Sequence, residues 1–268
     1  MSLSYLRQGA PDAPRLAFIL HGILGSARNW RLWARRLASV HPTWQFVVPD
    51  LRHHGESHEQ LGANTVRACA RDLAALATEL GQSPDLVIGH SFGGKVAMAY
   101  GREMPAGLRG VWVLDAIPSA PGQLPPDHEV ARVIRALQTF QEPFDRRESV
   151  RDALVGMGFS DMLAGWMTTN LRRSEAGFVW RFDLDAVLEL LEDYMVDDLW
   201  PWLQQTAVPV HLVRAGASDR WDAHELARLQ ALPAPFEYIE MPDAGHWLHV
   251  DDPDTLFGHL SRGLHAVT

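Results

Sequence analysis

The chain has 268 residues, of which 47% are hydrophobic and 21% charged, so it is long and apolar enough for one globular α/β domain with an insertion. Its formal net charge of −9 makes the average surface repel phosphate, so we expect no nucleic-acid partner and no attraction to an anionic bilayer. The single cysteine, Cys69, rules out an internal disulfide and a thiolate zinc site, and we find no membrane-spanning run or secretory signal, so we expect a cytoplasmic protein.

Short apolar runs alternate with helical patterns up to Asp115. The runs expected as buried strands are residues 16–20, 46–48, 86–88 and 111–114. The segments with helical spacing of apolar residues are 29–39, 66–80 and 96–100. This βαβαβαβ order predicts an α/β fold with a mainly parallel sheet, helices on both faces and ligand sites at the carboxyl ends of the strands.

The alternation stops after Asp115. From Pro118 to about Trp202 the sequence is helical or loop-like, without a convincing buried strand, and it is rich in Met and Trp. The sheet then resumes with expected strands at 209–213 and 236–241, a helix around 224–232 and a closing helix from about Pro253. We therefore predict a core of residues 1–117 and 203–268, interrupted by an inserted helical cap at 118–202.

A serine stands at a tight turn between a strand and a helix. The segment Gly89-His90-Ser91-Phe92-Gly93 follows an expected buried strand and precedes a helix. In this context the pattern G-x-S-x-G indicates a nucleophilic serine. A nucleophile needs such a turn because its oxygen must project from the sheet while the helix N-terminus supplies N–H groups beside it. Ser91 is therefore the predicted nucleophile.

The loop after an earlier strand can approach the same point. Residues 21–25, His-Gly-Ile-Leu-Gly, form a glycine-softened turn that can bring a backbone N–H against the nucleophile. With the N–H of Phe92, the N–H of Ile23 would complete an oxyanion hole.

A histidine lies in the loop after the last expected strand. His246, in Ala-Gly-His-Trp, can reach back over the sheet edge to Ser91, and imidazole suits a general base because its unperturbed pKa lies near 6.5. We interpret His90 as structural and place His211 within a strand. Four further histidines are expected at the surface or in loops, namely His53, His54, His249 and His259.

Two aspartates could orient the histidine. Asp219 follows the expected strand at 209–213, in the chain order Ser, Asp, His, and Asp115 ends the strand directly after the helix of the nucleophile. Either carboxylate could reach the imidazole, and the one that does not is expected to be a hydrogen-bonded turn residue.

Six segments of the chain resemble those of one known family. They read HGILGSARNW, DLRHHGES, GHSFGGKVAMAY, VLDAIP, GASD and AGHWLHVDDP. Together they resemble the α/β-hydrolase fold family over essentially the whole chain except the cap, closest to the small bacterial esterases and thioesterases of the YbfF kind. The resemblance implies an α/β-hydrolase sheet, and in that group the aspartate of an LDxxP segment serves as the acid.

The resemblance slightly favours Asp115, because Leu114 to Pro118 match the LDxxP pattern. The wider family places its acid after the later strand, and Asp219 lies one residue beyond the spacing usual there. Asp219 remains the alternative.

The predicted reaction is acyl transfer to water through a Ser-His-Asp triad and an acyl-enzyme, with no metal or organic cofactor. The expected substrate is a small-molecule carboxylic ester with a small or medium apolar acyl group, and thioesters stay open. C–C bond hydrolysis and cofactor-free haloperoxidase or perhydrolase chemistry can run from the same triad. A non-catalytic ligand-binding receptor is the alternative of another class.

The cap would decide which substrate binds. Its large side chains either fill the cap's own small core or line an apolar acyl pocket. For the pocket we single out Trp166 and Trp247, with Met167 and Trp180 as further candidates. Arg172 and Arg173 could favour an anionic leaving group such as coenzyme A, and the oligomeric state is not predicted.

Overall fold

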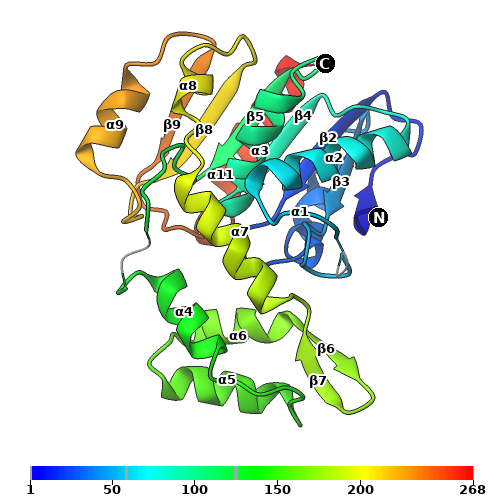
Figure 1. Ribbon diagram of the computed structural model, residues 1–268. Helices are drawn as coiled ribbons and strands as arrows, with labels where there is room; N and C mark the ends of the chain where they lie inside the picture. Colours follow the sequence, from blue (N-terminus) through cyan, green and yellow to red (C-terminus); the bar gives the residue numbers. More distant parts are fainter. Residues whose placement is uncertain (1, 58–59, 124–125, 268) are drawn as a thin grey trace.

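A mainly parallel sheet forms the centre of the molecule (Figure 1). The computed structural model describes residues 2–57, 60–123 and 126–267. Within them the strand order is β1-β3-β2-β4-β5-β8-β9, in which β1 is antiparallel to β3 and the other neighbours are parallel. The strands are β1 (Tyr5–Gln8), β2 (Arg15–Leu20), β3 (Trp44–Pro49), β4 (Leu86–His90), β5 (Gly110–Leu114), β8 (Val210–Ala215) and β9 (Phe236–Met241).

Helices cover both faces of this sheet, as the sequence predicts. One face packs against α1 (Ala27–Val40) and α11 (Pro253–Ala266), and the other against α2 (Val66–Leu80) and α3 (Phe92–Glu103). Short helices α8 (Trp200–Leu203), α9 (Ala223–Gln230) and α10 (Leu248–Asp251) complete the core. None of the helices in the described ranges combines the length and apolar character needed to cross a membrane.

The edge strand β1 is absent from the sequence-based expectation. Its four residues are only partly buried and include Arg7 and Gln8, so they lack the continuous apolar run that marks the central strands. Every other strand of the sheet was expected. The structure extends β2, β3, β4 and β5 by one to three residues and leaves β9 unchanged, while β8 starts one residue later and ends two residues later than expected.

Most of the chain between β5 and β8 lies at one end of the core, in the lower half of Figure 1. Its elements are α4 (Glu129–Leu137), α5 (Arg147–Gly156), α6 (Asp161–Thr169), β6 (Leu171–Ser174), β7 (Gly177–Trp180) and α7 (Leu184–Val196). Helix α7 leads from there back to the sheet, where α8 lies beside β8. We call residues 118–202 the cap, a division that stays a prediction, and residues 124–125 of it lie outside the described ranges.

The cap contains a β-hairpin that the sequence analysis did not expect. Strands β6 and β7 pair antiparallel, from Leu171 opposite Trp180 to Ser174 opposite Gly177. The expectation that this segment is helical or loop-like is wrong at the hairpin, because each strand has only four residues and β6 carries two arginines, which removes the apolar run used to recognise strands.

Helix α7 connects the cap to the core through polar contacts at α3. The amine of Lys95, a fully buried residue, donates to the carbonyl oxygen of Ser119 at 2.7 Å and to that of Tyr194. Arg102 on the same helix binds Asp197 with its Nη1 2.9 Å from Oδ1. Both ends of the cap are thereby fastened to one core helix.

The turn from β4 to α3 packs without room for side chains. A Cβ on Gly89 would lie 2.0 Å from the carbonyl oxygen of Gly93, and a Cβ on Gly93 would lie 2.5 Å from the carbonyl oxygen of His21. In both cases the obstacle is backbone, which cannot move aside without shifting a strand or a helix.

Replacing Gly89 by alanine should therefore destabilise the fold. We expect Gly89→Ala to lower the free energy of unfolding by about 3 kcal/mol or more, because overpacking against backbone leaves no rotamer to relieve it. Gly156→Ala, in α5 where a Cβ meets nothing within 4 Å, is the matched control and should change stability by less than about 1 kcal/mol. Urea titration followed by circular dichroism measures both, and equal stability of the two variants would contradict the close packing.

Candidate functional site

Ser91 occupies a strained turn at the carboxyl end of β4. Its φ of 54° and ψ of −121° place a non-glycine residue in a sparsely populated region of backbone conformation. Its N–H donates to the carbonyl oxygen of Leu114 on β5 at 2.9 Å, and its own carbonyl accepts from Gly94 at 2.8 Å. These bonds hold the turn, so the side chain lies at the N-terminus of α3.

His246 lies in the loop between β9 and α10, and its ring contacts a buried carboxylate. Nδ1 of His246 is 2.7 Å from Oδ2 of Asp115, which follows β5 with a φ of 49°. The other carboxylate oxygen accepts from the Ala215 N–H at 3.1 Å and from Nε1 of Trp221 at 2.7 Å. Burial alone would raise the pKa of Asp115, but the bonds from His246 and Trp221 outweigh it and keep the pKa below its usual value.

The second candidate acid is not near the imidazole. Asp219 is an exposed residue of the turn between β8 and α9, and no contact in the described chain joins it to His246. Asp115 meets the ring because β5 ends beside β4 in the sheet, which brings the residues after both strands to the same edge.

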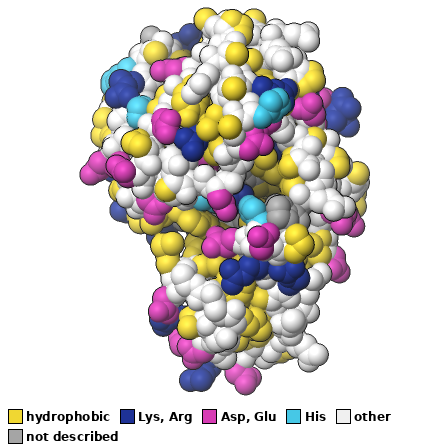
Figure 2. Space-filling model, turned by 90° about the vertical axis from the view of Figure 1, so that its left-hand side faces the viewer, with side chains coloured by type: hydrophobic (Ala, Val, Ile, Leu, Met, Phe, Trp, Pro, Cys, Tyr) yellow, Lys and Arg dark blue, Asp and Glu magenta, His cyan; other side chains and the backbone are white. Residues whose placement is uncertain are grey.

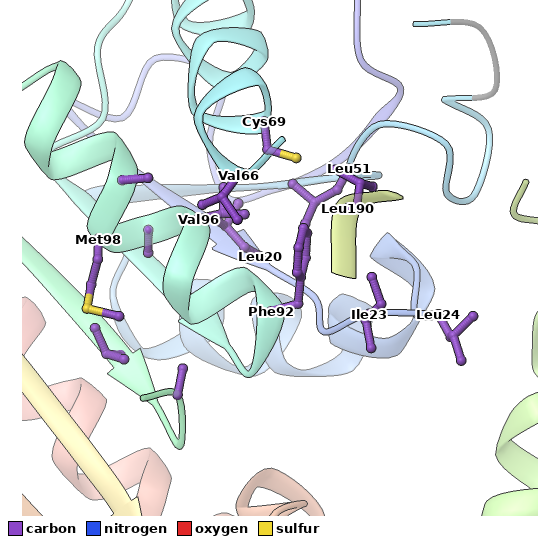
Figure 3. Close-up of a cluster of buried hydrophobic side chains, with 14 of the residues drawn as sticks. Leu20, Ile23, Leu24, Leu51, Val66, Cys69, Phe92, Val96, Met98 and Leu190 are labelled. Atoms are coloured by element: carbon purple, nitrogen blue, oxygen red, sulfur yellow. The ribbon is translucent and has the colours of Figure 1, made fainter. Parts of the chain in front are cut away.

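The loop after β2 passes directly against the serine. A Cβ on Gly22 would lie 3.3 Å from Cβ of Ser91, so the next residue, Ile23, starts beside the turn. Phe92 begins α3, and Figure 3 shows its side chain directed toward Leu51 and Leu190 in the buried cluster. The side chain of Phe92 thus serves the core, and its backbone remains beside Ser91.

Two buried histidines hold this loop in place. Nε2 of His54 accepts from the N–H of Leu24 at 3.1 Å, and Nε2 of His21 accepts from the N–H of Leu51 at 3.0 Å. Leu24 has a φ of 61°, so the bond to His54 supports a strained residue. Burial and the neighbouring His21 lower the pKa of His54 to about 3, which keeps it a neutral acceptor.

His53, His54 and His249 were expected at the surface or in loops. His53 and His54 do lie in the loop after β3 and His249 lies in α10, but a surface position is wrong for all three. All three are buried, with exposures of 7%, 0% and 8%, while His259 is partly buried. His249 stacks on Trp30 with ring centroids 4.5 Å apart. Histidines indicate a polar segment in a single sequence, but the ring of His249 stacks on Trp30, that of His54 bonds to backbone and that of His53 contacts Oδ1 of Asn64, which the sequence does not reveal.

His90 also contributes to this arrangement. Its Nε2 is 2.8 Å from the carbonyl oxygen of His246, and the two rings lie 4.7 Å apart. His90 is therefore placed to position the backbone of His246, in line with the structural role expected for it.

A pocket opens between the core and the cap, and Figure 2 shows this junction as a hollow where hydrophobic side chains gather. Ser91 and His246 line it, with Ile23 from the loop after β2. Trp166 and Trp247, both expected in the pocket, form part of its wall, with ring centroids 4.7 Å apart. The remaining apolar wall comprises Leu24, Trp30, Val130, Val133 and Leu163.

Four other expected pocket residues lie elsewhere. Met167 and Trp180 are buried in the hydrophobic core that the cap shares with the rest of the chain, because α6 and β7 turn these side chains inward. Arg172 and Arg173 belong to β6, away from the residues that line the pocket. The suggestion of an arginine patch there for an anionic leaving group has no support from this arrangement.

An arginine that the sequence analysis did not single out stands next to the imidazole. Nε of Arg220 is 2.9 Å from Nδ1 of His246, and its Nη1 is 3.2 Å from Nε2 of His128. Burial, and then the positive charge of Arg220, lower the pKa of His246 below its usual value against the opposing effect of Asp115. The sequence around Arg220 does not predict this contact, because a single arginine in a loop forms no recognisable motif.

The described part of the chain contains no group of three or more His, Cys, Asp or Glu side chains arranged to hold a metal ion.

The family is identified by comparison with known proteins. Residues 17–258 match the model described as the Alpha/beta hydrolase family. The chain belongs to this family. The sn-1-specific diacylglycerol lipase ABHD11 of Mus musculus is 30% identical over 94% of this hydrolase and 82% of the relative. The N-formylmaleamate deformylase of Pseudomonas putida is 26% identical over 94% of the chain and 89% of the relative.

Solved structures share the architecture of this hydrolase. One described as a marine microorganism esterase superimposes with a TM-score of 0.81 at 22% identity, covering 97% of this chain and 98% of that one. The likeness confirms the fold. With the family match and the relatives named as lipase and deformylase, it supports an enzyme that catalyses hydrolysis.

The geometry around His246 predicts how its pKa responds to substitution. We expect the ring of this hydrolase to titrate below about 6.5, since burial and Arg220 disfavour the imidazolium. Arg220→Met should raise that pKa and Asp115→Asn should lower it further, because they remove a repelling and an attracting charge. Histidine-labelled NMR measures both, with the signal assigned by His246→Gln.

Arg31→Met, which removes an exposed arginine of α1, is the control and should leave the titration of His246 unchanged. A pKa that does not rise in Arg220→Met would show that the guanidinium does not act on this ring.

Proposed function

We propose that the protein is a serine hydrolase that cleaves carboxylic esters, with Ser91 as nucleophile, His246 as general base and Asp115 as the acid that orients the base. One observation carries the proposal. The serine on its strained turn and the imidazole bonded to a buried carboxylate line the same pocket. A nucleophile, a base and an orienting group in this arrangement are the components that acyl transfer requires.

In this mechanism His246 uses its two nitrogens differently. Nδ1 keeps its proton and donates a hydrogen bond to Oδ2 of Asp115. This tautomer leaves Nε2 unprotonated and able to take the proton of the Ser91 hydroxyl. The Ser91 oxygen then attacks the ester carbonyl carbon, and the imidazolium returns the proton to the departing alcohol. Water repeats the sequence on the acyl-enzyme and releases the acid.

The charge that develops on the carbonyl oxygen needs preorganised donors. The N–H groups of Ile23 and Phe92 fill this role in the proposal, helped by the positive end of the α3 dipole. The bond from Leu24 to His54 supports the loop that carries Ile23, so a histidine remote from the reacting atoms keeps one donor in position.

The wall of the pocket points to an apolar acyl group. Trp166, Trp247 and Leu163 present hydrocarbon surface close to the serine, so an acyl chain of small or medium length can be buried there. Relatives named as a lipase and a deformylase support cleavage of an acyl compound. Thioesters react through the same steps and fall within the proposal as a second class of substrate.

A fluorophosphonate probe tests the nucleophile without assuming a substrate. We expect wild-type protein to gain the mass of one adduct and Ser91→Ala to gain none, since only an activated serine reacts. Ser83→Ala, which removes an exposed serine, is the matched control and should label like wild type. An adduct that persists in Ser91→Ala, or its absence from wild type, would refute the proposal.

The two aspartates give a second test. Asp115→Asn should lower kcat for 4-nitrophenyl butyrate by roughly 10⁴-fold, because an amide stabilises the wrong tautomer of His246. Asp219→Asn removes an exposed turn carboxylate and should change kcat by less than about threefold. Steady-state kinetics of both variants decides between them, and a large loss in Asp219→Asn alone would reverse the assignment.

A further inference from the structure

Arg220 brings a positive charge into an otherwise largely apolar pocket. It lies in the turn between β8 and α9 and lines the same pocket as Ser91, Trp166 and Trp247. Its contacts there are to two imidazoles, at 2.9 Å from Nε to His246 and 3.2 Å from Nη1 to His128. Neither neighbour carries a negative charge.

The contact with His246 does not satisfy the guanidinium. Asp115 is kept ionised by its surroundings, and a carboxylate only accepts, so Nδ1 of His246 must carry the proton in their 2.7 Å bond. Nε of Arg220 also carries a proton that points at this same nitrogen. Two donors therefore face each other, and the arginine gains no acceptor from the ring.

The contact with His128 also gives the guanidinium no hydrogen-bond acceptor. Nδ1 of His128 accepts from the N–H of Val130 at 3.2 Å at the start of α4, so a neutral His128 carries its proton on Nε2. That nitrogen faces Nη1 of Arg220. Burial, together with the charge of Arg220, lowers the pKa of His128, so the ring has no tautomer that serves both partners.

The carboxylates around Arg220 do not bond to its guanidinium directly. Among residues 2–57, 60–123 and 126–267 no Asp or Glu forms an ion pair with Arg220. The oxygens of Asp115 are used by His246, Ala215 and Trp221. Glu129 lines the same pocket but forms no ion pair with Arg220, and it is exposed, as are Asp127 and Asp219.

We propose that Arg220 binds a carboxylate of the substrate, so that the preferred esters carry a negative charge in addition to the scissile ester group. A carboxylate supplies the acceptors that neither imidazole offers, and it matches the planar fork of a guanidinium. This inference rests on the proposed ester hydrolysis and narrows its substrate class. The charge could sit in the acyl half, as in monoesters of dicarboxylic acids, or in the leaving group, as in esters of hydroxybenzoic acids.

Two matched substrate pairs distinguish these sources. For the acyl half we would compare mono-4-nitrophenyl glutarate with its neutral methyl ester, and for the leaving group 4-carboxyphenyl butyrate with its neutral methyl ester. The charged and the neutral ester of each pair are assayed on the same variant at the same pH of about 8, so the titration of His246 cancels from their ratio. Ser91→Ala supplies the rate of spontaneous hydrolysis to be subtracted.

The decisive quantity is the ratio of kcat/KM for the charged ester to that for its neutral partner. We expect Arg220→Met to lower this ratio by about 10- to 100-fold in one pair, mainly through KM, because it removes a charge-assisted bond. The ratio in Arg220→Lys should lie between those of wild type and Arg220→Met, since lysine keeps the positive charge but lacks the planar two-donor fork. Arg31→Met should keep the wild-type ratio.

An independent measurement uses wild-type protein alone. Glutarate should slow fluorophosphonate labelling of Ser91 at lower concentration than the neutral glutaramide does, which tests binding even if Arg220→Met does not fold. An Arg220→Met variant that loses kcat/KM equally for the charged and the neutral ester of each pair would overturn the proposal, and equal protection by glutarate and glutaramide would overturn it for the acyl half. Absence of labelling and of hydrolysis in wild type would instead refute the ester hydrolase function itself.

Discussion

The close contact of backbone at the turn between β4 and α3 determines where every other part of the site lies. Because Gly89 and Gly93 have no Cβ, α3 can pack so close to β4 and to the loop after β2 that backbone carbonyl oxygens lie where their side chains would be. Ser91 then has to adopt a positive φ, whose cost is offset by the burial of α3 from Phe92 to Gly101. Because the same turn touches the loop after β2 and bonds to the end of β5, its position also fixes the distances from Ser91 to Ile23 and to Asp115.

The features that the sequence predicts well are those set by short stretches of chain. An apolar run followed by Gly-x-Ser-x-Gly specifies the strand and the turn that carry Ser91, and the loop after the last strand carries His246, while the catalytic roles of both stay a proposal. The choice between Asp115 and Asp219 as the acid cannot be made from a short stretch of sequence. It depends on which turn the loop after β8 makes, and there Ala215 and Trp221 donate to Asp115 while Asp219 faces outward.

The features that the sequence analysis missed arise from contacts between distant segments. His54 was expected at the surface or in a loop, yet this loop residue lies fully buried, and its ring accepts from Leu24, thirty residues earlier. Arg220, His246 and His128 come from three segments that are far apart in the sequence, so no local pattern predicts their contacts. The net charge of −9 likewise describes the whole surface and gives no indication of a cation within one pocket.

Lys95 has a consequence for how movement of the cap can be followed. It is the only lysine in the sequence, and its amine is held between α3 and the carbonyl oxygens of Ser119 and Tyr194 at the two ends of the cap. Burial lowers its pKa to about 8, so the amine becomes nucleophilic near neutral pH once a reagent reaches it. No other lysine competes for an acylating reagent, so the rate of lysine modification in the unaltered protein reports how often the cap separates from α3.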